Sequence, residues 1–310
     1  MASIRARIYR QLLRLLFLSI DADTDIPVAR AKFEQIARRM PMRRGTTLQR
    51  GVIGAVDCEW VVPEDAGEDA PLLLYLHGGA YVCGSSATHR AMLSHLAAFA
   101  GMRALIPNYR LAPEHPFPAG LHDCQAVYRA LLGAGYDAGS MAVAGDSAGG
   151  GMSLALLVSM RDEGTPLPAA AVLFSPWLDL TGSGPTMESR ATVDPMFRAD
   201  DMPTVAAYYA PEERLRDPLI SPLFADVHDL PPMLIQVGDQ EILLSDSTRL
   251  CDKMSAAGGK VTLQVWPELW HVFQYAVGRV PEAKRALADA GNFLAKLTGE
   301  QQRTGSIRAA

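Results

Sequence analysis

The 310-residue sequence predicts an α/β fold in which a mostly parallel sheet is flanked by helices. Short apolar runs, bounded by glycine or proline, alternate with segments of helical character along most of the chain. Several runs are apolar throughout, which is typical of parallel strands buried on both faces. The composition agrees, because 49% apolar and 20% charged residues fall in the globular range.

The first 45 residues are expected to form two helices. In the first, apolar residues recur at helical spacing with arginines on the other side: Ile4, Ile8, Leu12, Leu15 and Leu16, continued by Ser19. We expect this amphipathic helix to pack on its own protein through the apolar side. The alternative is a weak contact with an anionic membrane surface. The uninterrupted apolar run at 15–18 is only four residues long, which supports neither a signal peptide nor a spanning helix.

Strands and helices then alternate to the end of the chain. Two short β-rich segments are expected at 51–56 and 59–63, followed by a buried strand in the apolar run at 71–79. The later strands are expected at 102–109, 140–147, 169–176, 231–238 and 260–267, and the helices at 120–132, 149–161 and 282–297. Residues 177–219 interrupt this order with prolines, acids and a short helical piece at 202–209. This segment is interpreted as an insertion over the carboxyl edge of the sheet, where such folds bind ligands.

A serine motif marks the end of the strand expected at 140–147. Gly145-Asp146-Ser147-Ala148-Gly149 fits the pattern G-x-S-x-G between an apolar strand and a helix. The glycines permit a sharp turn that lifts the Ser147 hydroxyl above the sheet, at a helix start that favours developing negative charge. A plain glycine turn that caps a helix is the alternative. The strand-turn-helix context favours Ser147 as a nucleophile.

A glycine-rich loop follows the strand within 71–79. His77-Gly78-Gly79-Ala80 is a variant of the loop that lines oxyanion holes in esterases. We expect the N–H groups of Gly78, Gly79 and Ala148 to form the hole, because no side chain obstructs the two glycines. Taken alone, the loop fits a glycine turn equally well; beside Ser147 the oxyanion hole is favoured. His77 is expected to fix the loop rather than to transfer protons.

The candidate base is His271, one of seven histidines. In hydrolases of this kind the order along the chain is serine, acid, histidine, and His271 follows the last expected strand after a short turn. His228 also follows Ser147, but it precedes the strand at 231–238, so no acid-bearing loop lies before it.

With these residues the chain resembles the bacterial hormone-sensitive-lipase-like esterases, the family IV carboxylesterases of the α/β-hydrolase fold. The matching segments run in the family's order across roughly 72–297: HGGAYVCGS, PNYRLAPEHPFPAGLHDC, AVAGDSAGGGMSLAL, ISPLFADVHDLPPMLIQVG and WHVFQ. The resemblance implies a serine ester hydrolase (EC 3.1.1) with Ser147 as nucleophile and His271 as base. A departure at Ala80, where many relatives have a third glycine, keeps the backbone N–H.

The resemblance also implies a division of the chain. The α/β-hydrolase catalytic domain is expected at 46–176 and 220–300, and a helical cap at 1–45 and 177–219. Residues 301–310 are expected to form a C-terminal tail. Members of the family often form homodimers, so a homodimer is a further expectation.

The triad acid is expected within GDQEILLSD, residues 238–246. Set against the Asp-Pro-Leu-x-Asp pattern common in the family, this stretch places Glu241 at the catalytic position. Glutamate is an accepted third member of such triads. Asp239, close to the strand end, is the rival. Asp246 ranks third, as an acid whose place at a helix start is favourable for dipole reasons alone.

The expected substrate is a small carboxylic ester with a short to medium acyl chain. Residues proposed to line its pocket are Tyr81, Trp177, Met196, Phe197, Tyr208 and Tyr209. The mechanism requires no cofactor or metal, and a net charge of −5 gives no reason to expect nucleic acid. Four scattered cysteines without a Cys-x-x-Cys pair indicate reduced thiols, hence a cytoplasmic location. The alternatives are another acyl hydrolase or acyltransferase acting on amides or lactones, and, more remotely, a non-catalytic ligand receptor.

Overall fold

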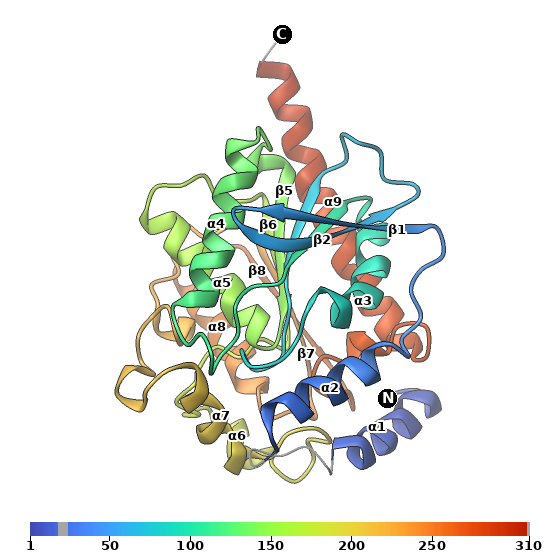
Figure 1. The fold of residues 1–310 in the computed structure, drawn as a ribbon, viewed down its shortest axis with the longest axis vertical. Coiled ribbons are helices and arrows are strands. Elements are labelled where there is room, and N and C mark those ends of the chain that lie inside the picture. The colour runs from blue at the N-terminus through green and yellow to red at the C-terminus, as the bar shows by residue number, and fades with distance from the viewer. Residues whose placement is uncertain (18–23, 309–310) are drawn as a thin grey trace.

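The computed structural model describes residues 1–17 and 24–308, with side chains as far as residue 299. Its centre is an eight-stranded sheet of order β1-β2-β4-β3-β5-β6-β7-β8 (Figure 1). The strands are β1 (Thr46–Ile53), β2 (Val56–Pro63), β3 (Leu72–Leu76), β4 (Arg103–Pro107), β5 (Met141–Asp146), β6 (Ala170–Phe174), β7 (Met233–Gly238) and β8 (Val261–Trp266). The pairs β1–β2 and β2–β4 are antiparallel and the other five pairs are parallel, which confirms the mostly parallel sheet.

Helices cover both faces of the sheet, as Figure 1 shows. One face packs against α3 (Ser86–Ala100) and α9 (Pro281–Arg308), and the other against α4 (Ala119–Gly133), α5 (Ala148–Asp162) and α8 (Leu244–Ala256). Strands β3, β5, β6 and β7 are buried along their whole length, because helices from both sides exclude water from them. The predicted α/β class is therefore confirmed.

A group of short helices lies across the lower end of the sheet in Figure 1. It comprises α1 (Ile4–Phe17) and α2 (Ile26–Ala37) from the N-terminal part, and α6 (Thr186–Ser189) and α7 (Met202–Tyr209) from the insertion. Short 3-10 turns complete the chain: η1 (Ala138–Ser140), η2 (Ala199–Asp201), η3 (Glu212–Arg214), η4 (Pro222–Phe224) and η5 (Phe273–Ala276). Among the described helices, none is long and apolar enough to cross a membrane.

Several elements differ from the prediction. The segment 51–56 is not one strand, because Gly54 and Ala55, both with positive φ, form the turn between β1 and β2. Helix α3 was not predicted, since its buried polar residues obscure the apolar periodicity. Helix α9 continues past the expected end at 297 to Arg308, because no proline breaks it, so much of the expected tail is helical.

Helix α1 packs on the protein through a face other than the predicted one. The inward residues are Ala6, Tyr9, Leu13 and Phe17, and Tyr9 stacks on Trp270 with 5.6 Å between the ring centroids. The predicted apolar face points to solvent: Ile4, Ile8, Leu12 and Leu15 are 75%, 58%, 50% and 67% exposed. Ala6 and Leu13 are buried in the same cluster as Trp270, and the ring of Tyr9 packs against that cluster. Ser19 lies outside the described residues.

Candidate active site

Ser147 occupies a sharp turn between β5 and α5. Its backbone has φ 53° and ψ −125°, a conformation that residues other than glycine rarely adopt. The turn requires glycine at positions 145 and 149, because each of them lies too close to neighbouring backbone atoms for a side chain to fit. An added Cβ would lie 2.3 Å from the carbonyl oxygen of Gly149 in the first case and 2.1 Å from that of Leu76 in the second. The strained turn presents Ser147 at the carboxyl end of the sheet, as the motif predicts.

Glu241 contacts His271. Nδ1 of His271 lies 2.8 Å from Oε2 of Glu241, and both side chains are buried. Because a carboxylate only accepts hydrogen bonds, Nδ1 carries the hydrogen and Nε2 keeps a free lone pair. Oε1 of Glu241 accepts from the hydroxyl of Ser175 at 2.8 Å and from the N–H of Gly238 at 2.7 Å. Three donors therefore fix this one carboxylate.

The two rival acids have other partners. Oδ1 of Asp239 accepts from the N–H of Glu268 at 2.7 Å, which holds the turn after β8. Asp246 lies in the first turn of α8, but it is buried, and its Oδ2 accepts from the N–H groups of Leu178 and Asp179. The prediction of an ordinary acid at a helix start is therefore incomplete, since Asp246 also holds the start of the insertion. Burial raises its pKa to about 7.

The structure contradicts one predicted oxyanion donor, Gly78. The N–H of Gly78 donates to Oδ1 of Asp146 at 3.0 Å, and Nε2 of His89 lies 3.1 Å from the same nitrogen. A group bonded inside the protein cannot also face a substrate oxygen. The next two residues of the loop, Gly79 and Ala80, line the cavity beside Ser147. No described residue accepts a hydrogen bond from the N–H of Gly79, Ala80 or Ala148.

Asp146 is the buried anchor of this loop. Its Oδ1 also accepts from the hydroxyl of Tyr75 at 2.7 Å. Burial alone would raise the pKa of Asp146, but electrostatic attraction to His89 and hydrogen bonds with His89, Tyr75 and Gly78 lower it. The carboxylate is therefore ionised and holds Gly78 in place.

His77 has the structural position that was predicted for it. Its ring stacks on Tyr109 at 4.2 Å, and Tyr109 donates its hydroxyl to the carbonyl oxygen of His77 at 2.6 Å. Burial lowers the pKa of His77 to about 3, so its ring stays neutral.

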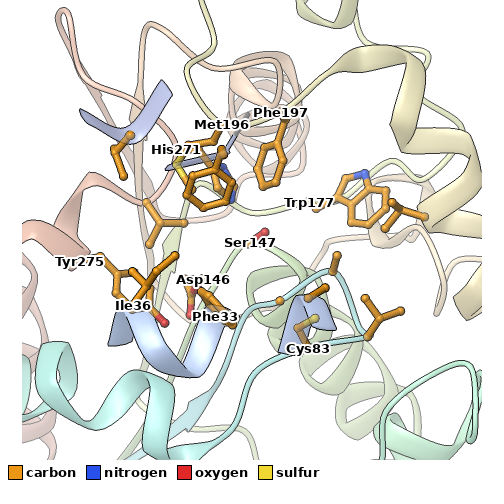
Figure 2. Close-up of a pocket in the computed structure, with 18 of the residues that line it drawn as sticks. Phe33, Ile36, Cys83, Asp146, Ser147, Trp177, Met196, Phe197, His271 and Tyr275 are labelled. Carbon is orange, nitrogen blue, oxygen red and sulfur yellow. The ribbon is translucent and has the colours of Figure 1, made fainter. Parts of the chain in front are cut away.

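A mostly apolar cavity of about 240 Å³ lies above Ser147. Figure 2 shows Ser147 facing it, with Phe33 and Ile36 on one side and Met196, Phe197 and His271 on another. Helices α1 and α2 contribute residues that the sequence did not single out, among them Tyr9, Leu13, Phe33 and Ile36. The sequence offered no signal for them, because an apolar helix face looks the same whether it meets a core or a cavity.

The predicted pocket residues separate into two groups. Trp177, Met196, Phe197 and Tyr208 line the cavity. Tyr81 and Tyr209 do not belong among its lining residues: both are buried, and their rings stack on each other at 3.8 Å. Tyr81 is also tilted against Trp177 at 6.0 Å. These two tyrosines therefore support the wall from behind, because stacking satisfies their aromatic faces inside the protein.

Asp194 connects the insertion to the loop that carries Glu241. Its Oδ1 accepts from the N–H groups of Met196 and Phe197, and its Oδ2 accepts from the N–H of Ile242 at 2.9 Å. The ring of Phe197 in turn meets His271 edge-on at 4.7 Å. Asp194 thus fixes one cavity wall relative to the His271–Glu241 pair.

One further nucleophile borders the cavity, Cys83. Burial raises the pKa of its thiol to about 11, so it is protonated near neutral pH and is a poor nucleophile. Among the described residues, no cluster of three or more histidine, cysteine or acidic side chains could hold a metal ion.

Comparison with known proteins gives matches over most of the chain. Residues 73–275 match a protein family described by the alpha/beta hydrolase fold. An acetyl-hydrolase of Streptomyces hygroscopicus is 44% identical over 248 residues, which cover 80% of this chain and 82% of the relative. A solved esterase of the bacterial hormone-sensitive lipase family superimposes with a TM-score of 0.92 at 41% identity, covering 96% of this chain and 99% of that one. EstE5, from a crystal soaked in p-nitrophenyl butyrate, gives a TM-score of 0.91 at 36% identity, covering 96% and 100%.

Proposed function

Because this chain belongs to the α/β-hydrolase family, among the esterases of the bacterial hormone-sensitive lipase group, we propose that it hydrolyses small carboxylic esters with a Ser147–His271–Glu241 triad. The observation that carries the proposal is the 2.8 Å contact between Nδ1 of His271 and Oε2 of Glu241. Of the two residues, His271 lines the cavity that Ser147 faces. This arrangement leaves Nε2 of His271 as the base for the serine.

The reaction proceeds in two halves. His271 takes the proton of Ser147 as the serine oxygen attacks the ester carbonyl, and it then gives that proton to the leaving alcohol. A water molecule, activated by the same histidine, hydrolyses the acyl-enzyme and releases the acid. Glu241 holds the tautomer of His271 and stabilises the imidazolium that forms twice per cycle.

The negative charge on the carbonyl oxygen is stabilised by backbone N–H groups of Gly79, Ala80 and Ala148. This set differs from the predicted one by a single position, because Gly78 is bonded to Asp146. Ala148 is the first residue of α5, so its N–H has no partner within the helix and the helix dipole adds to its effect. Removal of one such donor typically costs about 10²–10³ in turnover.

The size and lining of the cavity favour short to medium acyl chains. A volume of about 240 Å³ is below the roughly 300–1,000 Å³ typical of sites for drug-sized ligands. Phe33, Ile36 and Phe197 form apolar walls that bury hydrocarbon rather than a charged group. The relative from Streptomyces is an acetyl-hydrolase and EstE5 was soaked with a butyrate ester, which agrees with this range.

The cellular setting is also part of the proposal. The four cysteines are free thiols, and two of them, Cys58 and Cys124, are buried. Free thiols of this kind are consistent with a location in the cytoplasm, which is a reducing compartment. The homodimer that the family resemblance implies remains a prediction for light scattering to test.

The proposal is tested by hydrolysis of p-nitrophenyl esters from acetate to palmitate by the wild type and by Ser147→Ala. We expect the largest kcat/KM for acyl chains of two to about eight carbons, and a loss of at least about 10³-fold in the variant. The matched control is Ser140→Ala, a serine outside the cavity. Absence of activity on every chain length, or full activity in Ser147→Ala, would reject the proposed function.

A further inference from the structure

We propose that the outer face of α1, formed by Ile4, Ile8, Leu12 and Leu15, docks on the surface of an anionic lipid bilayer. The distribution of exposed apolar side chains points to this face. In the described part of the chain nine large apolar side chains are exposed. Five of them lie on α1 and one, Met1, precedes it: Met1, Ile4, Ile8, Leu12, Leu15 and Leu16. The remaining three, Val28, Val52 and Val265, lie on three different elements. A concentration of this kind marks an interaction site.

The outer face is a continuous stripe, because its residues recur every three or four positions of a helix. The opposite side of α1 is already occupied by contacts of Ala6, Tyr9 and Leu13 with the protein. Rotation of the helix to bury the stripe would break those contacts. The exposed face is therefore a stable feature of the fold.

Two arginines hold α1 in this orientation. Arg7 forms an ion pair with Glu268 at 2.9 Å, and Arg14 donates to the carbonyl oxygens of Thr192 and Val193. Both lie to one side of the stripe, and the exposed Arg5 lies at its other edge. The stripe thus points outward, with Arg7 and Arg14 held on one side of it and Arg5 at its other edge.

The charge of α1 selects the partner. Residues 1–17 contain four arginines and no acidic residue, although the whole chain carries a net charge of −5. A basic helix with an apolar face is the form that lies in the interface of anionic lipids, where each arginine adds to the attraction. The stripe buries in the acyl boundary while the exposed Arg5 at its edge meets lipid phosphates.

A second copy of the chain fits this face less well. Pairing two such faces about a two-fold axis would bring the arginines of both copies together, and their like charges repel. The stripe also offers four apolar residues, whereas a standard protein interface uses about 20–30 residues a side. Charge and size therefore both favour a bilayer.

Docking would place lipid next to the substrate cavity. Tyr9, Leu13 and Phe17, on the inner side of the same helix, line that cavity. An ester dissolved in the bilayer would then reach Ser147 past a single helix. The docking itself does not depend on the proposed triad, so the two can be tested separately.

The test is cosedimentation of the full chain with vesicles of phosphatidylglycerol and phosphatidylcholine. We expect the wild type to bind these vesicles, to bind pure phosphatidylcholine weakly, and to dissociate in high salt. Ile8→Gln/Leu12→Gln should bind about tenfold more weakly, because two apolar anchors are lost. Val52→Gln, which removes an apolar side chain of similar exposure (67%) on β1, is the matched control and should bind like the wild type.

Two readouts separate docking from other effects. Hydrolysis of a water-soluble short ester by the double variant should equal that of the wild type, since neither side chain lines the cavity; this shows that the variant is folded. Light scattering without lipid should give the same mass for both proteins. Vesicle binding that is absent in the wild type or unchanged in the double variant would overturn the proposal. So would a dimer that the double substitution dissociates, because it would assign the face to a second copy.

Discussion

At the scale of single residues, the environment of each acid decides its role. Glu241 is buried, receives two hydrogen bonds on one oxygen and offers the other to His271. Asp239, only two positions earlier, turns to the backbone of Glu268 instead. The extra methylene of glutamate matters here, because it carries the carboxylate back from the loop to the histidine. Position in the motif and geometry thus favour the same acid.

The first prediction separates these two acids. Glu241→Gln keeps the shape but not the charge, so it should lower kcat on p-nitrophenyl butyrate by about 10²–10⁴-fold through the wrong histidine tautomer. Asp239→Asn retains an acceptor for the N–H of Glu268 and should stay within about threefold of the wild type. Steady-state kinetics at saturating ester measure both. Equal losses, or the larger loss at Asp239, would contradict the assignment of Glu241.

At the scale of elements, buried carboxylates tie the insertion to the core. Asp246, at the start of α8, holds the N–H groups of Leu178 and Asp179, where the insertion begins. Asp194, further along the insertion, holds the N–H of Ile242 beside Glu241. Burial raises the pKa of both carboxyls. Since protonation removes their charge, attachment of the insertion should depend on pH.

The second prediction concerns that dependence at Asp246. Its pKa in the folded state, about 7, is above the value near 4 of an unfolded aspartate. The stability it contributes is therefore present at acid pH and is lost as the pH rises through 7. Asp246→Asn stays neutral, so its free energy of unfolding relative to the wild type should rise by roughly 1–2 kcal/mol between about pH 5.5 and 8. Urea denaturation at both pH values measures it, with the exposed Asp252→Asn on the same helix as control. Parallel pH profiles for Asp246→Asn and the wild type would refute it.

The strands and helix α1 show how far secondary structure and its orientation could be predicted from the sequence. Apolar runs predicted the central strands because parallel strands buried on both faces leave no alternation to misread. The same signal was misleading for α1, on whose predicted apolar face Ile4, Ile8, Leu12 and Leu15 are exposed. Periodicity identifies the apolar side of a helix, but only the surface below decides whether that side turns inward. Here that surface includes Trp270, which stacks with Tyr9 and lies in the same buried cluster as Ala6.

In the candidate site, too, some features could be predicted from the sequence and others could not. The order of Ser147, Glu241 and His271 along the chain could be predicted, because the fold places each one after a particular strand. The bond from the N–H of Gly78 to Asp146 could not be predicted, since it joins positions 68 apart in sequence. The stacking of Tyr81 on Tyr209 could not be predicted from the sequence either. Contacts between distant segments were what the sequence could not supply.

At the scale of the whole molecule, the sheet assembles the site. Ser147 follows β5, Glu241 follows β7 and His271 follows β8, so parallel strands bring all three to one edge. The helices of the N-terminal part and the insertion lie across that end of the sheet (Figure 1), and residues from both line the cavity. The proposed mechanism therefore requires one reactive serine within this apolar cavity.

Reaction with an alkyl fluorophosphonate, followed by peptide mass spectrometry, tests this requirement most directly. The reagent phosphonylates a serine that a neighbouring base activates, so we expect one equivalent on Ser147. Esterase activity should fall in proportion to labelling, and Ser147→Ala should remain unlabelled. His271→Ala should react at least about 10²-fold more slowly, since the base is absent. Loss of activity with the label on another residue, or full activity after complete labelling of Ser147, would contradict the account.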